Sequence, residues 1–193
     1  MKNRLLFLAV ITLMFSCKEN ESTAQLAPIS ENTVTVVSKF PESVPTCEPN
    51  KKLFDAVPHL DTYAVYNFKH VGCSKRGLVA QYDHPTEEFY EFTFTINEEV
   101  NENKTMYNYI RIGYNNAVKL DIEDTYVSDL HIFDNAFITT TTEAEYEEAK
   151  YHATYKDKYI IIMTLRGKNL SSKAAIDSYV KDYLESINKD FLN

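Results

Sequence analysis

Apolar and polar residues alternate with a period of two in several parts of the chain, a pattern typical of β-strands with one buried and one solvent-exposed face. The clearest run covers residues 89–96, where Tyr90, Phe92, Phe94 and Ile96 alternate with glutamate and threonine. Together with two shorter runs before it, this run predicts an antiparallel meander. The other predicted strands cover residues 63–68, 78–82, 130–133 and 137–141.

A longer hairpin is predicted over residues 146–166. Alternate positions on its first arm share one face of an extended segment, and residues 156–158, Lys-Asp-Lys, supply a turn. Residues 159–165 return as an apolar run typical of a central strand. The first arm carries Ala149, Tyr151, Ala153 and Tyr155 on that face.

Two segments change to a helical spacing of three and four residues. Residues 104–120 predict an amphipathic helix, although residues 110–112 are also compatible with a strand. A second helix is predicted after Ser171 or Ser172, either of which offers an N-cap. The apolar stripe of the first is Met106, Tyr109/Ile110, Gly113/Tyr114 and Ala117/Val118, and that of the second is Ile176, Tyr179/Val180, Tyr183/Leu184 and Ile187. Residues 51–57 predict one or two further helical turns.

These elements predict an α+β fold, in which an antiparallel sheet has helices packed on one face and the C-terminal amphipathic helix covers the sheet. A single globular domain is expected over residues 46–193. Residues 17–45 contain Pro28, Pro41 and Pro45 among Ser, Thr, Asn and Glu and show little periodicity. They predict a flexible tether.

The first sixteen residues have the layout of a secretory signal peptide. Lys2 and Arg4 form a basic head, and residues 5–15 form an apolar run shorter than the roughly twenty residues of a membrane span. Residues 13–17, Leu-Met-Phe-Ser-Cys, resemble the lipobox of bacterial lipoproteins. The resemblance implies cleavage before Cys17, a diacylglycerol on its thiol and acylation of the new amino terminus, which together anchor the protein stably in a membrane. The alternative is an ordinary signal peptide cleaved near Ser16.

The residues after Cys17 bear on the location of the protein. Lys18-Glu19-Asn20-Glu21 resembles the signal with which some Gram-negative bacteria mark surface-exposed lipoproteins, and position 18 is not the Asp that retains other lipoproteins at the inner membrane. The expected location is therefore the bacterial outer membrane, with display on the cell surface as the narrower hypothesis. The alternative is that these residues are only a polar tether.

Charge excludes one class of partner. Residues 1–16 contain Lys2 and Arg4 and no acidic residue, so the rest of the chain has 18 basic and 28 acidic residues and a formal charge of −10. Nucleic-acid binding depends on Lys and Arg to neutralise phosphates, so no nucleic-acid partner is expected. The acidic balance also disfavours adhesion to anionic lipid headgroups. It either serves solubility alone or steers a basic partner towards the protein.

With Cys17 assigned to lipid, Cys47 and Cys73 remain as a pair in an oxidising compartment. They predict a disulfide that closes a loop of roughly 27 residues and contributes about 3 kcal/mol. The alternative is a reactive Cys73 thiol activated by His70.

No catalytic, cofactor-binding or metal-binding residue is predicted. Residues 72–77 have the glycine spacing of a phosphate-binding loop, but Leu78 and Val79 stand where Lys and Ser/Thr are needed, so a turn is expected. Asp129 and His131 supply only two possible zinc ligands, and residues 121–126 lack the glycine of an EF-hand. Three alternate glutamates on an extended strand either protect a sheet edge or receive a basic partner; they are Glu143, Glu145 and Glu147.

The sequence therefore predicts a lipid-anchored envelope lipoprotein with a non-enzymatic role, binding an envelope protein or serving as an accessory subunit. One alternative is an immunity lipoprotein that neutralises a toxin aimed at the envelope. A second alternative is an enzyme whose catalytic residues are dispersed along the chain.

Overall fold

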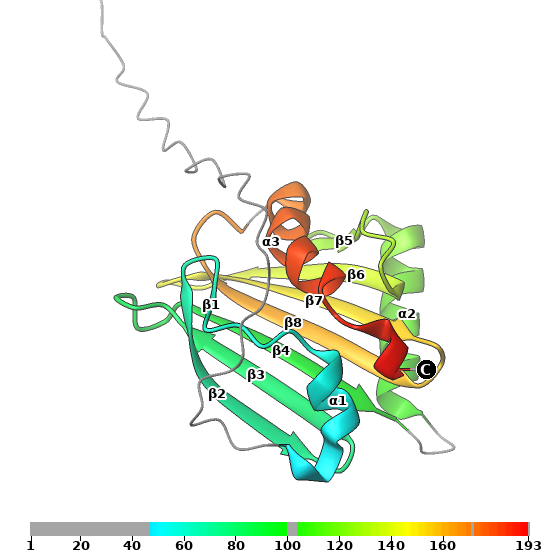
Figure 1. Cartoon of the computed structure of the whole chain (residues 1–193). Coiled ribbons are helices and arrows are strands. Elements are labelled where there is room, and N and C mark those ends of the chain that lie inside the picture. The colour runs from blue at the N-terminus through cyan, green and yellow to red at the C-terminus, as the bar shows by residue number, and fades with distance from the viewer. Residues whose placement is uncertain (1–46, 100–103, 171, 193) are drawn as a thin grey trace, which may run out of the picture. The chain divides into compact units, whose positions relative to one another are not determined.

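A computed structural model describes residues 47–99, 104–170 and 172–192. The signal peptide, Cys17 and the tether lie outside the described residues. The described part contains one eight-stranded antiparallel sheet in the order β1-β2-β3-β4-β8-β7-β6-β5 (Figure 1). Its strands are β1 (Thr62–Tyr63), β2 (Tyr66–Ser74), β3 (Gly77–Asp83), β4 (Glu91–Glu98), β5 (Thr125–Val127), β6 (Asp134–Thr142), β7 (Glu147–Tyr155) and β8 (Tyr159–Gly167).

The sheet consists of two meanders that meet in the middle. Strands β1 to β4 follow one another from one edge, and β5 to β8 follow one another from the other edge. The last strand of each meander pairs with the other, with Phe94 opposite Met163. Helix α2 (Thr105–Leu120) therefore connects a central strand to the far edge of the sheet.

The larger hydrophobic core lies on one face of the sheet. Phe92, Phe94 and Ile96 of β4 are fully buried there, which is the alternation expected of a strand with one buried face. Helix α3 (Lys173–Glu185) contacts this face through Tyr183, whose ring centroid lies 5.1 Å from that of Phe92. Three short helices complete the described elements: η1 (Glu48–Asn50), α1 (Lys51–Ala56) and η2 (Lys189–Leu192).

A second, smaller cluster lies on the opposite face. Tyr107 and Ile110 of α2 pack there with Phe137 and Ile160. Ile160 and its neighbour Ile161 belong to different clusters, because successive residues of a strand point to opposite faces. The antiparallel α+β class is confirmed, but the expectation of helices on only one face is wrong.

Several predicted elements are confirmed. Residues 104–120 correspond to α2, the hairpin to β7 and β8, and the strand run at 89–96 to β4 with a shift of two residues. Ser172 is the N-cap of α3, and its hydroxyl accepts a hydrogen bond of 3.2 Å from the amide of Ala175.

One predicted strand is interrupted in the structure and another does not form. The run at 63–68 is divided between β1 and β2 by a tight turn, in which Ala64 has a left-handed φ of 51°. Neither Gly nor Asn marks this turn in the sequence, although these residues adopt that conformation most readily. Residues 130–133 lie in turns, and the edge strand forms earlier, at β5.

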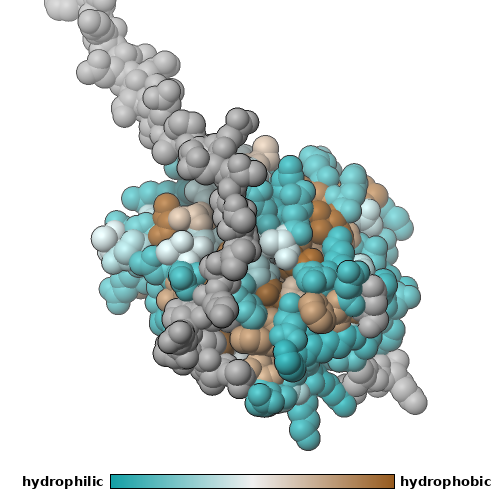
Figure 2. Space-filling view, viewed as in Figure 1, coloured by the Kyte–Doolittle hydropathy of each residue, from teal (hydrophilic) through white to brown (hydrophobic). Residues whose placement is uncertain are grey.

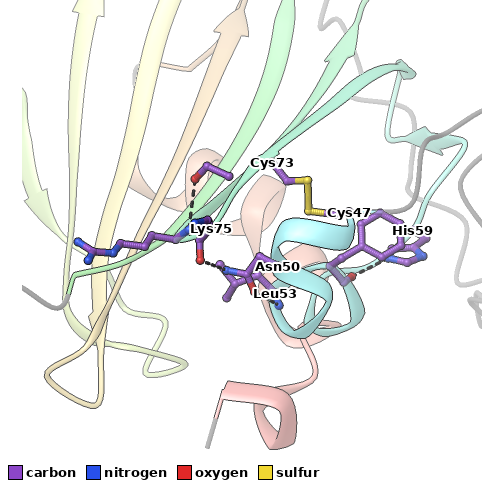
Figure 3. Close-up of a disulfide and its surroundings, with 9 residues drawn as sticks. Cys47, Asn50, Leu53, His59, Cys73 and Lys75 are labelled. Atoms are coloured by element: carbon purple, nitrogen blue, oxygen red, sulfur yellow. Dashed lines mark hydrogen bonds between the residues drawn. A yellow bond between two sulfur atoms is a disulfide. The ribbon is translucent and has the colours of Figure 1, made fainter.

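The predicted disulfide is confirmed. Cys47 and Cys73 are bonded, with their Cα atoms 5.9 Å apart (Figure 3). Nearby, the Asn50 side-chain amide donates to the carbonyl of Lys75 over 3.1 Å, and its oxygen caps α1 at the amide of Leu53. The disulfide and the Asn50 amide together hold the start of the domain on the β2–β3 hairpin. The alternative of a reactive Cys73 is wrong, because activation by His70 would require a free thiol.

Candidate functional site

Exposed apolar side chains concentrate on and just after α2. Six of the ten large hydrophobic residues that are exposed in the described part of the chain lie between positions 106 and 122. Exposed apolar residues that cluster in this way commonly mark an interaction site, whereas scattered ones are ordinary. We call five of the six the α2 surface: Met106, Tyr109, Ile112, Leu120 and Ile122.

The geometry of the helix explains this exposure. Ile110 is fully buried, and Ile112 follows it by two residues, which is about 200° around an α-helix. Ile112 therefore points to solvent and is 55% exposed, while Tyr109 and Leu120 are 63% and 61% exposed. Figure 2 shows a different side of the domain, that of α1 and α3, where hydrophilic residues are prominent and hydrophobic ones show in smaller patches between them.

Helix α2 is held at its N-terminus by side chains from segments that flank the strands. The carboxylate of Glu99 accepts hydrogen bonds from the amides of Met106 and Tyr107, over 3.2 and 2.7 Å. These bonds satisfy donors that the first turn of a helix leaves without an intrahelical partner. The hydroxyl of Tyr107 donates to Asp157 in the β7–β8 turn. The apolar side chains of α2 thus project from a helix anchored to the sheet.

A hollow of about 210 Å³ lies between α2 and the edge of the sheet. Tyr109 and Ile112 form its helical wall, and Phe137 of β6 forms part of its floor. The rest of its lining is Gly113, Asn116, Ile122, Thr125 and Thr139. The hollow is therefore a mainly apolar recess beside the α2 surface.

Charge is unevenly distributed around this hollow. Helix α2 contains no acidic residue, although the whole chain has a formal charge of −8. The loop that follows α2 contains the exposed residues Asp121, Glu123 and Asp124. Among the described residues, the carboxylates of Asp121 and Glu123 form no ion pair. Three exposed carboxylates therefore flank Ile122 in the chain, at one end of the hollow.

Beneath α2, His152 of β7 lies on the same face of the sheet. Its ring stacks on Phe137 with centroids 4.7 Å apart, and its Nε2 lies 3.3 Å from the Thr139 hydroxyl. Its other nitrogen, Nδ1, is buried with no hydrogen-bond partner in the described structure. Burial, with a smaller contribution from Lys150, lowers the pKa of His152 to about 4, so the ring is neutral at pH 7.

The neighbouring part of this face carries a chain of paired charges. Arg166 of β8 contacts Glu91 at 3.0 Å and Glu148 at 2.7 Å, so it bridges the two meanders. Lys150 also pairs with Glu148, and Lys69 pairs with Asp83 at 2.6 Å. Burial alone would raise the pKa of Glu148, but hydrogen bonds from Lys150 and Arg166 outweigh it and lower that pKa. These charges neutralise one another within the sheet.

The three glutamates of residues 143–147 do not share one side of a strand, so that prediction is wrong. Glu143 and Glu145 lie in the loop between β6 and β7. Glu147 begins β7, and its carboxylate accepts a hydrogen bond of 2.5 Å from the amide of Leu170. Glu147 thus ties the start of β7 to the segment that follows β8.

The other polar candidates occupy ordinary structural positions. Asp129 pairs with Lys173 at 2.6 Å. His84 lies in a turn, where its Nδ1 accepts from the amide of Glu87 over 3.1 Å. Within residues 47–99, 104–170 and 172–192, no three His, Cys, Asp or Glu side chains are grouped as a metal site would need. In the same ranges, no helix has the length and hydrophobicity required to cross a bilayer.

Sequence reasoning missed the α2 surface because it assigned Met106, Tyr109 and Val118 to the buried stripe of the helix. The structure buries Ile110 of that stripe together with Tyr107, which was not part of it, and exposes those three residues. A signal was present in the sequence: apolar residues occur on too many sides of α2 for a single sheet contact to bury them all.

Comparison with known proteins adds no assignment, because no family model, no curated protein and no solved structure matches this chain.

Proposed function

We propose that this protein is a lipid-anchored lipoprotein of the bacterial outer membrane whose domain binds a protein partner and does not catalyse a reaction. The lipobox-like residues ending at Cys17 support the anchor, and residues 18–21 support a position facing the cell surface. The binding role rests on one observation, the exposed apolar side chains of the α2 surface beside a hollow.

The chemistry of the α2 surface suits a protein partner. Tyrosine and methionine are enriched at protein interfaces, and both occur here beside aliphatic side chains. Each buried CH₂ group contributes about 0.8 kcal/mol, so covering Ile112, Leu120 and Tyr109 would stabilise a complex substantially. The paired charges around Arg166 offer less, because they are already neutralised within the sheet.

In this proposal, α3 acts as the cover of the opposite face of the sheet. Val180, Tyr183 and Leu184 of α3 are fully buried, and the ring of Tyr183 also lies 5.0 Å from that of Phe94. These contacts support a structural role for α3 and leave α2 as the helix that presents apolar side chains to a partner.

The test is affinity capture of the tagged, membrane-anchored protein from gently solubilised envelopes, in parallel with the double variant Tyr109→Gln/Ile112→Gln. Glutamine favours helices about as well as the aliphatic residues, so the variant should keep α2 while removing its apolar surface. We expect a stoichiometric partner with the unaltered protein and a loss of about tenfold or more with the variant.

A matched control changes exposed apolar residues elsewhere. Val65 and Phe89 are 55% and 50% exposed and lie outside α2, so Val65→Gln/Phe89→Gln should retain the partner. If both double variants lose the partner to the same extent, or if neither loses it, the assignment of binding to α2 is overturned. A basic secreted toxin as the captured protein would identify the narrower immunity function.

A further inference from the structure

Strand β5 is the edge of the sheet next to the hollow, and part of its backbone points away from the sheet. It pairs with β6 alone among the described strands. The carbonyl of Asp124 accepts from the amide of Thr140 over 2.9 Å, and the amide of Ser128 donates to Ala136 over 3.2 Å. Every second residue of an antiparallel strand bonds to a given neighbour. Val127 therefore turns both its N–H and its carbonyl outwards.

The residues of this edge do not block pairing, although a strand of only three residues limits how far a partner can pair with it. Natural edge strands are commonly blocked by Lys, Pro or a bulge. Strand β5 is Thr-Tyr-Val and pairs with β6 in regular register over all three residues. The N–H and carbonyl of Val127 are therefore open to a further strand, whereas the outward amide of Thr125 already donates to the carbonyl of Ile122 over 3.1 Å.

The hollow lies on the side of the sheet where such a strand would place half of its side chains. Thr125 and its cross-strand partner Thr139 both line the hollow, as does Phe137, the partner of Val127. A strand added beside β5 would lie about 4.8 Å away and direct alternate side chains to this face. Those side chains would meet Ile112 and Ile122, which are 55% and 40% exposed.

The charge beside β5 indicates the composition of the added strand. Asp121 and Glu123 directly precede β5, are exposed, and have no ion-pair partner in the described residues. A basic side chain at the end of an added strand would lie near them. Charge complementarity of this kind raises association rates and selects partners.

We propose that the partner binds by strand addition: an extended segment with alternate apolar side chains pairs with β5, fills the hollow against α2, and places a basic residue beside Asp121 and Glu123. This inference rests on the proposed protein-binding function and names the kind of partner segment. It is independent of the lipid anchor.

Two other occupants fit less well. A second copy of this chain, paired antiparallel through β5, would bring Asp129 of one copy towards Glu123 of the other; Asp129 pairs with Lys173, but its side chain remains 80% exposed. Like charges so placed oppose association. An anionic bilayer would attract Arg111 and Lys119 of α2, but it would repel the carboxylates of Asp121 and Glu123.

The test uses the full-length lipidated protein in neutral phosphatidylcholine vesicles. The probes are seven-residue peptides with Val, Ile, Leu or Phe at alternate positions and Lys at both ends, and the same peptides with Glu at both ends. Binding is measured by fluorescence anisotropy, and hydrogen exchange is measured at the Val127 amide. We expect the Lys peptides to bind about tenfold more tightly than the Glu peptides and to protect the Val127 amide.

Two variants test whether the acidic residues beside β5 cause the preference for Lys peptides. Asp121→Asn/Glu123→Gln should remove most of the preference for Lys peptides, and Asn suits position 121 because φ there is 40°. Glu87→Gln/Glu88→Gln removes the same charge from the β3–β4 loop and should leave the preference unchanged.

Several results would overturn strand addition. These are the absence of binding by every Lys peptide, binding without protection of Val127, or equal binding of Glu peptides. Val127 protection that appears without peptide and vanishes on dilution would assign the edge to a second copy. Selective docking of the domain on phosphatidylglycerol vesicles would assign the surface to a membrane. If envelope capture still depends on Tyr109 and Ile112, protein binding stands although strand addition fails.

Discussion

The ring of Phe137 occupies the space that a side chain at position 113 would need. A Cβ atom built on Gly113 would lie 2.5 Å from Cζ of Phe137, closer than real Cβ contacts allow. Glycine costs about 1 kcal/mol relative to alanine inside a helix. Here that cost is offset because the missing side chain lets α2 approach β6 and shapes the floor of the hollow.

Gly113→Ala should therefore destabilise the protein despite the higher helix propensity of alanine. We expect the free energy of unfolding to fall by about 1–3 kcal/mol, the usual effect of overpacking a well-filled contact. Chemical denaturation measures the change. Asn116→Ala, on the exposed side of the same helix, serves as the control and should leave stability unchanged or slightly raised. A Gly113→Ala variant as stable as this control would contradict the close contact.

The buried His152 should make stability fall as the pH is lowered. Its pKa is about 4 in the folded state and about 6.5 in an unfolded chain, so below pH 6.5 the unfolded chain binds a proton that the folded protein does not. The folded state should lose about 2 kcal/mol between pH 7 and pH 5. Denaturation at both pH values measures this loss.

The variant His152→Phe isolates that contribution, because phenylalanine retains a ring to stack on Phe137 but cannot bind a proton. Its stability should change much less between pH 7 and pH 5. An equal pH dependence in the variant and the unaltered protein would show that other groups are responsible.

The disulfide between Cys47 and Cys73 should contribute about 3 kcal/mol to the free energy of unfolding, because it closes a loop with a sequence separation of 26. Reduction should lower the unfolding midpoint by the corresponding amount. In Cys47→Ala/Cys73→Ala the midpoint should already be low, and reductant should have no further effect. An unchanged midpoint after verified reduction would contradict this prediction.

The proposed lipid anchor predicts that Cys17→Ala moves the protein from the membrane fraction to the soluble fraction, because the variant would lack the two or three acyl chains of that anchor. Fractionation and detergent-phase partition measure the change. Cys47→Ala/Cys73→Ala keeps Cys17 and should stay in the membrane fraction. Retention of Cys17→Ala in the membrane would argue for attachment by another part of the protein.

Local patterns predicted most of the elements that have one buried face. In β4, the alternation of Phe92, Phe94 and Ile96 with polar residues identifies both the strand and its buried side. In α3, the stripe from Ile176 to Leu184 and the Ser172 cap identify the helix. The tight turn at Ala64 and the short strand β5 were not predictable in the same way, because no Gly, Asn or long alternation marks them.

The position of α2 depended on contacts that no local pattern contains. Strand β8 buries Ile160 towards α2 and Ile161 towards the other core, so residues 159–163 are apolar without interruption and do not indicate which face receives a helix. Which side of α2 remains exposed follows from where Phe137 contacts Gly113, a pairing of residues far apart in the chain.

By itself, the sequence determined the antiparallel α+β class, the disulfide pair and the acidic balance, because periodicity, cysteine count and charge are local or additive properties. Only the tertiary structure decided that β4 pairs with β8, that helices lie on both faces, and that Tyr109 and Ile112 face solvent beside an open strand edge. The physical reason is that exposure depends on which surfaces remain after all the others have packed together.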